Sequence, residues 1–96
     1  MHDLVIRNAR IIDGLGNPSQ HGAIAINGGR ISEVGDDVGR GREIVDADGL
    51  ALSPGIVDIH THYDAQLTWD PWATPSVGLG VTTVVIGNCG FTIAPC

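Results

Sequence analysis

Lysine is absent from this 96-residue chain, and its five basic residues are all arginine. Together with 11 acidic residues they give a formal net charge of −6 at neutral pH. A chain this acidic lacks the basic surface that attracts nucleic acid or an anionic membrane, and we expect neither as a partner. The absence of lysine also excludes a lysine-derived metal ligand within these residues.

Long apolar runs are missing as well. No stretch reaches the ~18 uninterrupted apolar residues of a membrane-spanning helix. Charged and apolar residues alternate near the start of the chain, which is unlike the apolar centre of a signal peptide. We therefore expect a cytoplasmic protein. In such a chain the two cysteines, Cys89 and Cys96, are more typical of free thiols or a metal ligand than of a disulfide.

The length limits the possible architecture. The chain fits one small domain or a piece of a larger one. It is too short for a complete (β/α)8 barrel, which needs ~250 residues. With 43% hydrophobic and 17% charged residues it is not expected to be disordered. Its 14 glycines and five prolines favour many turns and short strands over long helices.

The first half of the chain predicts a small antiparallel β module that ends near Ser53. Asn27, Gly28 and Gly29 predict a tight hairpin, because these residue types tolerate positive φ. The strands are predicted at residues 4–12, 23–26, 30–34, 43–46 and 50–52.

The pattern changes at Pro54, and we place a domain boundary there, between residues 1–53 and residues 54–96. Residues 56–59 are nearly all apolar, as expected of a strand covered on both faces. Residues 81–86 are β-branched at every position and predict a second strand. A short helical segment is predicted at Ser76–Leu79. A strand, a helical segment and a strand in this order predict the start of a parallel βαβ unit.

Two histidines, His60 and His62, follow the apolar strand and carry the strongest chemical signal. Side chains two apart along a strand point to the same face, so we expect both rings on one side, with Ile56 and Asp58. Two imidazoles at the end of a strand can hold one divalent metal ion, and a metal there is typical of hydrolysis by an activated water. The alternative interpretation is two polar residues in a turn.

Three further residues near this pair are candidates for the site. Cys89 follows the second predicted strand and would join the same metal if the two strands are neighbours; the alternative is a buried cysteine that acts as a small apolar residue. Asp64 and Tyr63 directly follow His62 and are candidate substrate-pocket or second-layer residues, and Asp64 is suited to orienting a histidine. A solvated loop aspartate is the alternative for Asp64.

Other conspicuous side chains are expected to have structural or surface roles. Trp69 and Trp72 would either roof a pocket or pack in a core, and we predict packing. Asp58 is expected to be structural. His2 and His21 lie in polar surroundings and are predicted at the surface.

These motifs resemble a known superfamily. Residues 54–62 resemble the first barrel strand of the amidohydrolases, residues 4–13 resemble their opening strand, and residues 80–83 resemble their second barrel strand. The run His-Thr-His-Tyr-Asp at residues 60–64, together with Gly-Asn-Cys-Gly at 87–90 and Ala-Pro at 94–95, is more specific. It resembles the N-acyl-D-amino-acid deacylase (D-aminoacylase) branch.

The resemblance implies a fold class and a site. The chain would be mainly β, with part of a small β-sandwich and the first two strands of a TIM-like (β/α)8 barrel. It would belong to a zinc hydrolase that cleaves the C–N amide bond of a small N-acyl amino acid, with His60, His62 and Cys89 as metal ligands. The full enzyme would hold one or two zinc ions, and the 96-residue chain would bind zinc weakly or not at all.

The same resemblance places the remaining ligands and the acid–base aspartate beyond residue 96, so we expect the isolated chain to be inactive. Two alternatives stay open. One is a cyclic-amide hydrolase of the hydantoinase or dihydropyrimidinase kind. The other is a non-catalytic β module. We also expect the isolated chain to self-associate, because its barrel strands lack neighbours and expose β-branched edges that can pair with another chain.

Overall fold

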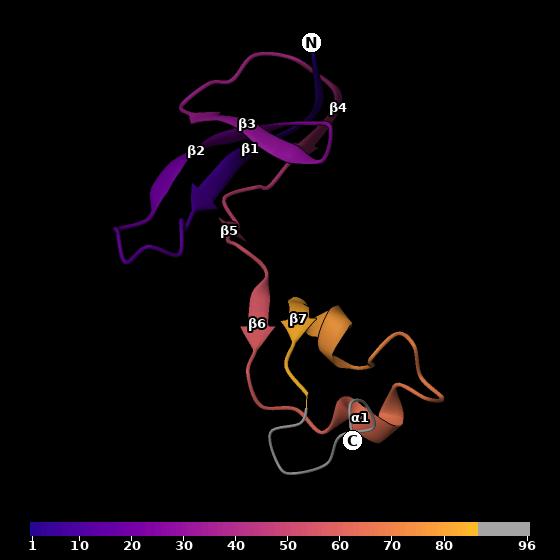
Figure 1. Cartoon of the computed structure of the whole chain (residues 1–96). Helices are drawn as coiled ribbons and strands as arrows, with labels where there is room; N and C mark the ends of the chain where they lie inside the picture. Colours follow the sequence, from indigo (N-terminus) through magenta and orange to yellow (C-terminus); the bar gives the residue numbers. More distant parts are fainter. Residues whose placement is uncertain (87–96) are drawn as a thin grey trace. The chain divides into compact units, whose positions relative to one another are not determined.

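The structure, a computed structural model, describes residues 1–86, apart from the side chains of Asp64 and Ala65. The chain divides into two compact units, Met1–Pro54 and Gly55–Cys96, and each is described by itself (Figure 1). Within the described residues, no helix has the length and apolar character needed to cross a membrane.

Unit 1 is a five-stranded mixed sheet built around its first strand. The strands are β1 (His2–Ile11), β2 (Gln20–Asn27), β3 (Arg30–Gly35), β4 (Gly41–Asp46) and β5 (Ala51–Leu52). Their order is β3-β2-β1-β4, with β5 also paired to β1 (Figure 1). The hairpin between β2 and β3 is confirmed: Gly28 and Gly29 have φ of 57° and 75°, the positive values that a two-residue hairpin loop requires.

The predicted antiparallel module is wrong for the second half of this sheet. β1, β2 and β3 are antiparallel neighbours, but β4 and β5 pair with β1 in parallel. β3 therefore runs in the same direction as β4, and the connection between them has to cross the sheet to reach the other side of β1. Such a crossover is a long-range feature that hairpin-type turn signals do not reveal.

A bulge at Asn8 lets β1 serve both parallel partners. Asn8 has a φ of 54°, a value that asparagine tolerates better than most residues, and the β1–β2 register shifts between Ile6 and Ala9. β4 pairs with β1 up to Arg7, and β5 pairs with it from Arg10 onward. The Asn8 carbonyl accepts a hydrogen bond from the Gly49 N–H at 2.8 Å, which ties the turn between β4 and β5 to the bulge.

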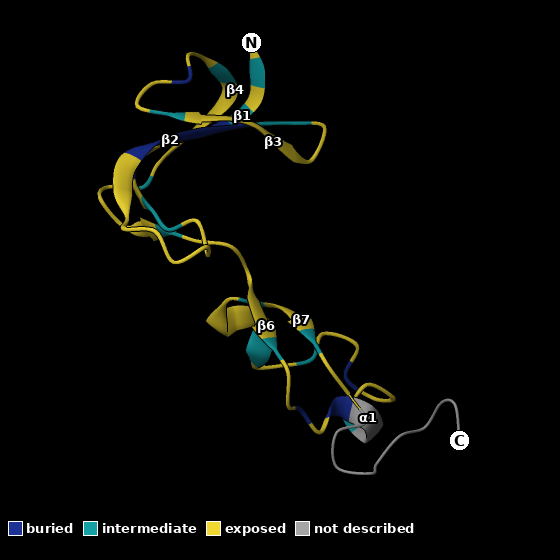
Figure 2. Cartoon of the chain, turned by 60° about the vertical axis from the view of Figure 1, so that its left-hand side comes forward, coloured by how far each residue is buried: buried dark blue, intermediate teal, exposed yellow. Residues whose placement is uncertain are grey.

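The core of unit 1 lies under the crossover connection. Val38, in the connection, packs with Val5 of β1 and with Ala23 and Ala25 of β2, and all four are buried. Figure 2 shows the buried residues gathered along β1 and β2. The small alanine side chains leave room for the connection to lie close to the sheet.

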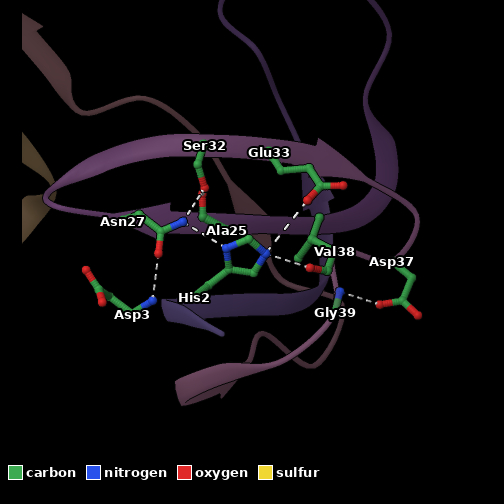
Figure 3. A network of polar contacts seen from close by, with 9 residues as sticks. All are labelled: His2, Asp3, Ala25, Asn27, Ser32, Glu33, Asp37, Val38 and Gly39. Carbon is green, nitrogen blue, oxygen red and sulfur yellow. Dashed lines mark hydrogen bonds and ion pairs between the residues drawn. The ribbon is translucent and has the colours of Figure 1, made fainter.

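His2 secures this crossover, so the prediction that it is a plain surface residue is wrong. Asn27 Nδ2 can only donate, and it lies 2.8 Å from His2 Nδ1, so Nε2 carries the ring proton and donates to the Val38 carbonyl at 2.8 Å. Glu33 Oε2 lies 3.7 Å from the same Nε2 (Figure 3). The ring therefore bridges the hairpin and the crossover connection. His21 is exposed, as predicted, with Nε2 2.8 Å from Asn8 Oδ1.

Unit 2 contains two parallel strands, β6 (Ile56–Asp58) and β7 (Val81–Val84). Between them lie a short helix, α1 (Tyr63–Gln66), and a 3-10 helix, η1 (Ser76–Leu79). The parallel pairing and the helical segment at Ser76–Leu79 were predicted and are confirmed. Helix α1 was not predicted, and both strands end earlier than expected. Ile56 and Val57 are 52% and 54% exposed, so residues 1–86 do not cover β6 on both faces.

Candidate functional site

His60 and His62 lie side by side immediately after β6. Their ring centroids are 5.5 Å apart, and the rings are inclined by 21°. The two rings are close together, as predicted, but not because they share one face of a strand. β6 ends at Asp58, so both histidines lie beyond the strand. Asp58 Oδ1 accepts a hydrogen bond from the His60 N–H at 3.1 Å, which turns the chain at this point and agrees with a structural role for Asp58.

Thr61, between the two histidines, fixes this segment to the end of β7. Its side chain is buried, and its Oγ1 donates to the Val85 carbonyl at 2.7 Å. The Val85 N–H donates in turn to the Asp58 carbonyl at 2.9 Å. The backbone around the pair is therefore held on both sides. Sequence reasoning passed over Thr61, although a small hydroxyl residue between two histidines is a visible signal.

A pocket of about 210 Å³ opens beside the pair. Its walls come from the end of β6, from the segment that follows it, from α1 and from η1. They are formed by Asp58, His60, Thr61, His62, Tyr63, Gln66 and Ser76. Tyr63 is buried, and its hydroxyl lies 2.6 Å from Ser76 Oγ. This hydrogen bond closes the pocket wall between α1 and η1.

Asp70 organises the loop that follows α1, and sequence reasoning did not single it out. Asp70 as a residue is only 8% exposed, and its carboxylate serves as an acceptor for several neighbours. It accepts hydrogen bonds from the Thr74 hydroxyl, from the Thr74 N–H at 2.9 Å, from Gln66 Nε2 at 3.0 Å and from the Trp72 N–H at 3.1 Å. The Thr74 hydroxyl, followed by the Gln66 amide, holds the pKa of Asp70 below its ordinary value, because these donors favour the charged carboxylate.

The two tryptophans of this loop are not packed in a core, which corrects the prediction. Trp69 and Trp72 are 74% and 77% exposed within this chain. The Asp70 hydrogen bonds hold the backbone of the loop, so the loop keeps its shape without burying either indole ring. Periodicity and composition do not reveal such a loop, because its hydrogen bonds depend on the three-dimensional path of residues 66–74.

The remaining candidates cannot be placed by side chain. Asp64 lies in α1, but its side chain is not described, and Cys89 lies outside the described residues. Among the residues that are described, no group of three or more histidine, cysteine or acidic side chains comes together as a metal site. The two imidazoles of His60 and His62 are suited to form part of a metal site. Neutral histidine nitrogens are ordinary zinc ligands, and the rings are close enough to face one ion. β7 ends at the same edge of the sheet as β6, because the strands are parallel.

Comparison with known proteins now assigns the chain to a family. The sequence model of a family described as the amidohydrolase family matches residues 43–95. The chain belongs to the amidohydrolase family.

Three similar amidohydrolases show what this chain is like. An N-acyl-D-aspartate deacylase from Alcaligenes xylosoxydans xylosoxydans is 48% identical over 94 residues, which cover 97% of this chain and 19% of the relative. A D-aminoacylase structure from a study of its binuclear metal centre superposes with a TM-score of 0.90 and 38% identity, over 100% of this chain and 20% of its own. The structure of an N-acyl-D-glutamate deacylase from Bordetella bronchiseptica, complexed with zinc and a phosphonate inhibitor, superposes with a TM-score of 0.87 and 35% identity. The match covers 99% of this chain and 20% of the deacylase.

These matches confirm the resemblance and the fold class that the sequence predicted. The chain is mainly β, as predicted, and a D-aminoacylase structure superposes on 100% of it with a TM-score of 0.90. It spans about a fifth of the length of the relatives it matches.

Proposed function

We propose that this chain is the N-terminal part of a metal-dependent amidohydrolase that removes the acyl group from an N-acyl-D-amino acid. The observation that carries the proposal is the pair of histidine rings, 5.5 Å apart, on a pocket directly after β6. The 48% identity to an N-acyl-D-aspartate deacylase supports the substrate class. In this proposal residues 1–53 belong to a β-sandwich, and residues 54–96 begin a TIM-like barrel.

His60, His62 and Cys89 are the residues that we propose hold the metal, with zinc as the ion. When bound, zinc polarises a carbonyl oxygen and lowers the pKa of a coordinated water toward ~7. The protein's own task is to fix the ligands. Asp58 and Thr61 hold the backbone on either side of the histidines, so the two rings are kept together before any ion arrives.

Tyr63 is proposed as a substrate-pocket residue, since its ring lines the pocket and Ser76 fixes its hydroxyl. Asp64 is proposed in the same region on its sequence position alone. The general acid–base carboxylate is proposed to come from a later part of the protein, where it would take a proton from water and deliver it to the departing amine.

The test is hydrolysis of N-acetyl-D-amino acids by the full-length protein, followed as release of free amine. N-acetyl-L-amino acids and a hydantoin serve as alternative substrates. The proposal expects hydrolysis of the D-substrates, and expects His60→Asn and His62→Asn to lose zinc and activity together. His21→Asn is the matched control, because His21 is an exposed histidine of unit 1. Hydrolysis of the hydantoin alone would instead support a cyclic amidase, and full activity in both variants would refute the metal assignment.

The isolated 96-residue chain is proposed to self-associate. Cross-strand pairing puts Ile26 of β2 opposite Ile31 of β3, and Ile24 opposite Val34. Ile31 and Val34 are 64% and 58% exposed, so one face of the sheet presents branched apolar side chains to solvent. A second copy of the chain would cover this surface.

A further inference from the structure

The amide of Gln66 has only one possible orientation. Its Nε2 lies 3.0 Å from Asp70 Oδ2 and 2.8 Å from the Thr74 carbonyl oxygen. A backbone carbonyl can only accept a hydrogen bond, and an ionised carboxylate can only accept as well. Both neighbours therefore require the amide nitrogen, and the reversed amide would bring its oxygen against two other oxygens.

Asp70 is well suited to maintain this orientation. It is nearly buried, and the backbone N–H groups of Trp72 and Thr74 hold its carboxylate in place. Hydrogen bonds from Thr74 and Gln66 favour its charged form, so the carboxylate remains an acceptor at neutral pH. The amide orientation of Gln66 is therefore held by Asp70, whose own carboxylate is held by the backbone of the loop.

This arrangement determines what Gln66 can offer to a ligand. Both amide protons are used by Asp70 and Thr74, so the side chain can meet a bound molecule only through its oxygen Oε1, as an acceptor. Gln66 also lines the pocket that contains the two histidines. The ligand group that pairs with it must be a donor.

We propose that Gln66 is a specificity-determining residue of this pocket, and that its Oε1 accepts a hydrogen bond from the N–H of the substrate amide, with Asp70 as the positioning residue. This inference rests on the function proposed above, because the scissile amide of an N-acyl amino acid carries one N–H. A hydrogen bond to that N–H fixes the amide plane and rewards substrates that have nitrogen at the scissile position. An ester of the same shape has no proton there.

The experiment compares an N-acetyl-D-amino acid with the matching O-acetyl-D-2-hydroxy acid in the full-length protein. Gln66→Met keeps the length of the side chain and removes its hydrogen-bonding atoms. We expect kcat/KM for the amide to fall about 3–10-fold relative to the ester, the effect of one neutral hydrogen bond. Asp70→Asn should shift the ratio in the same direction, since the substituted side chain carries its own N–H donors and would no longer require the amide nitrogen of Gln66.

The change in the amide-to-ester ratio separates a specificity role from a structural one. Asp13→Asn is the control, because Asp13 also accepts hydrogen bonds within a turn, from the Leu15 N–H and from Asn17, but lies in unit 1. It should leave the ratio unchanged. If Gln66→Met and Asp70→Asn lower both substrates equally, this inference is wrong while the proposed function stands. If the unaltered protein hydrolyses neither substrate, the proposed function itself fails.

Discussion

Gly55→Ala is expected to destabilise unit 2, because β6 and β7 approach each other too closely for a side chain at this position. A Cβ added to Gly55 would lie 2.7 Å from the Cβ of Thr82 and still closer to the Thr82 Oγ1 and Cγ2. Carbon atoms in contact are normally ~3.5–4.0 Å apart, so the two strands would have to separate. Rotating the Thr82 side chain does not help, because its Cβ does not move on rotation.

The expected size of the effect follows from two opposing terms. Overpacking of this kind costs about 1–3 kcal/mol, whereas replacing glycine with alanine returns about 0.4–1 kcal/mol by restricting the unfolded chain. From the middle of the two ranges we expect a net loss of about 1.3 kcal/mol. The assay is urea unfolding followed by tryptophan fluorescence, which reports on unit 2 because both tryptophans of the chain, Trp69 and Trp72, lie there.

Two further variants make this test specific. Gly78 in η1 is the matched control, because a Cβ there meets no described atom within 4 Å, and Gly78→Ala should unfold at the same or a slightly higher urea concentration than the parent. Thr82→Gly in the Gly55→Ala background should recover part of the loss, since it removes the clashing atoms. Equal midpoints for Gly55→Ala and the parent would refute the close-approach argument.

Three other predictions concern the core, the Asp70 loop and the apolar face. Val38→Ala should lower the unfolding free energy of unit 1 by about 1–3 kcal/mol, measured by circular dichroism during urea unfolding, because it opens a cavity among buried side chains. Because the pKa of Asp70 is lower in the folded protein than its ordinary value of 3.8, the ionised carboxylate stabilises the fold at pH values above 3.8. This stabilisation is lost as the pH falls from 3.8 through the lowered pKa. Tryptophan fluorescence should change over this pH range in the parent and stay flat in Asp70→Asn. Light scattering should find the isolated chain self-associated and Ile31→Lys shifted toward monomer, with Leu15→Lys as the exposed control; a monomeric parent at high concentration would contradict the proposed association.

The sequence predicted the features that depend on neighbouring residues. Gly28 and Gly29 set the hairpin by their own φ values, and the β-branched run at residues 81–86 identified β7. The pairing of His60 with His62 was also visible, because two residues so close in sequence stay close in space whether or not a strand continues through them.

The missed features depend on contacts between distant residues. The parallel placement of β4 needs the crossover connection, whose Val38 packs on β1 and β2. The hydrogen bond from His2 to the Val38 carbonyl joins residues that are 36 positions apart. The loop around Asp70 was missed because its hydrogen bonds join a helix end, a carboxylate and a backbone carbonyl. The alternation of apolar and polar residues and the amino-acid composition do not reveal such a group of hydrogen bonds.

The measurement that tests the central claim most directly is the spectrum of the full-length protein with Co²⁺ in place of zinc. A thiolate that binds Co²⁺ gives a charge-transfer band that histidine and oxygen ligands do not give. The account predicts this band in the parent, its loss in Cys89→Ser, and weaker Co²⁺ binding in His60→Asn and His62→Asn. A spectrum that is the same in all four proteins would contradict a metal site built from His60, His62 and Cys89.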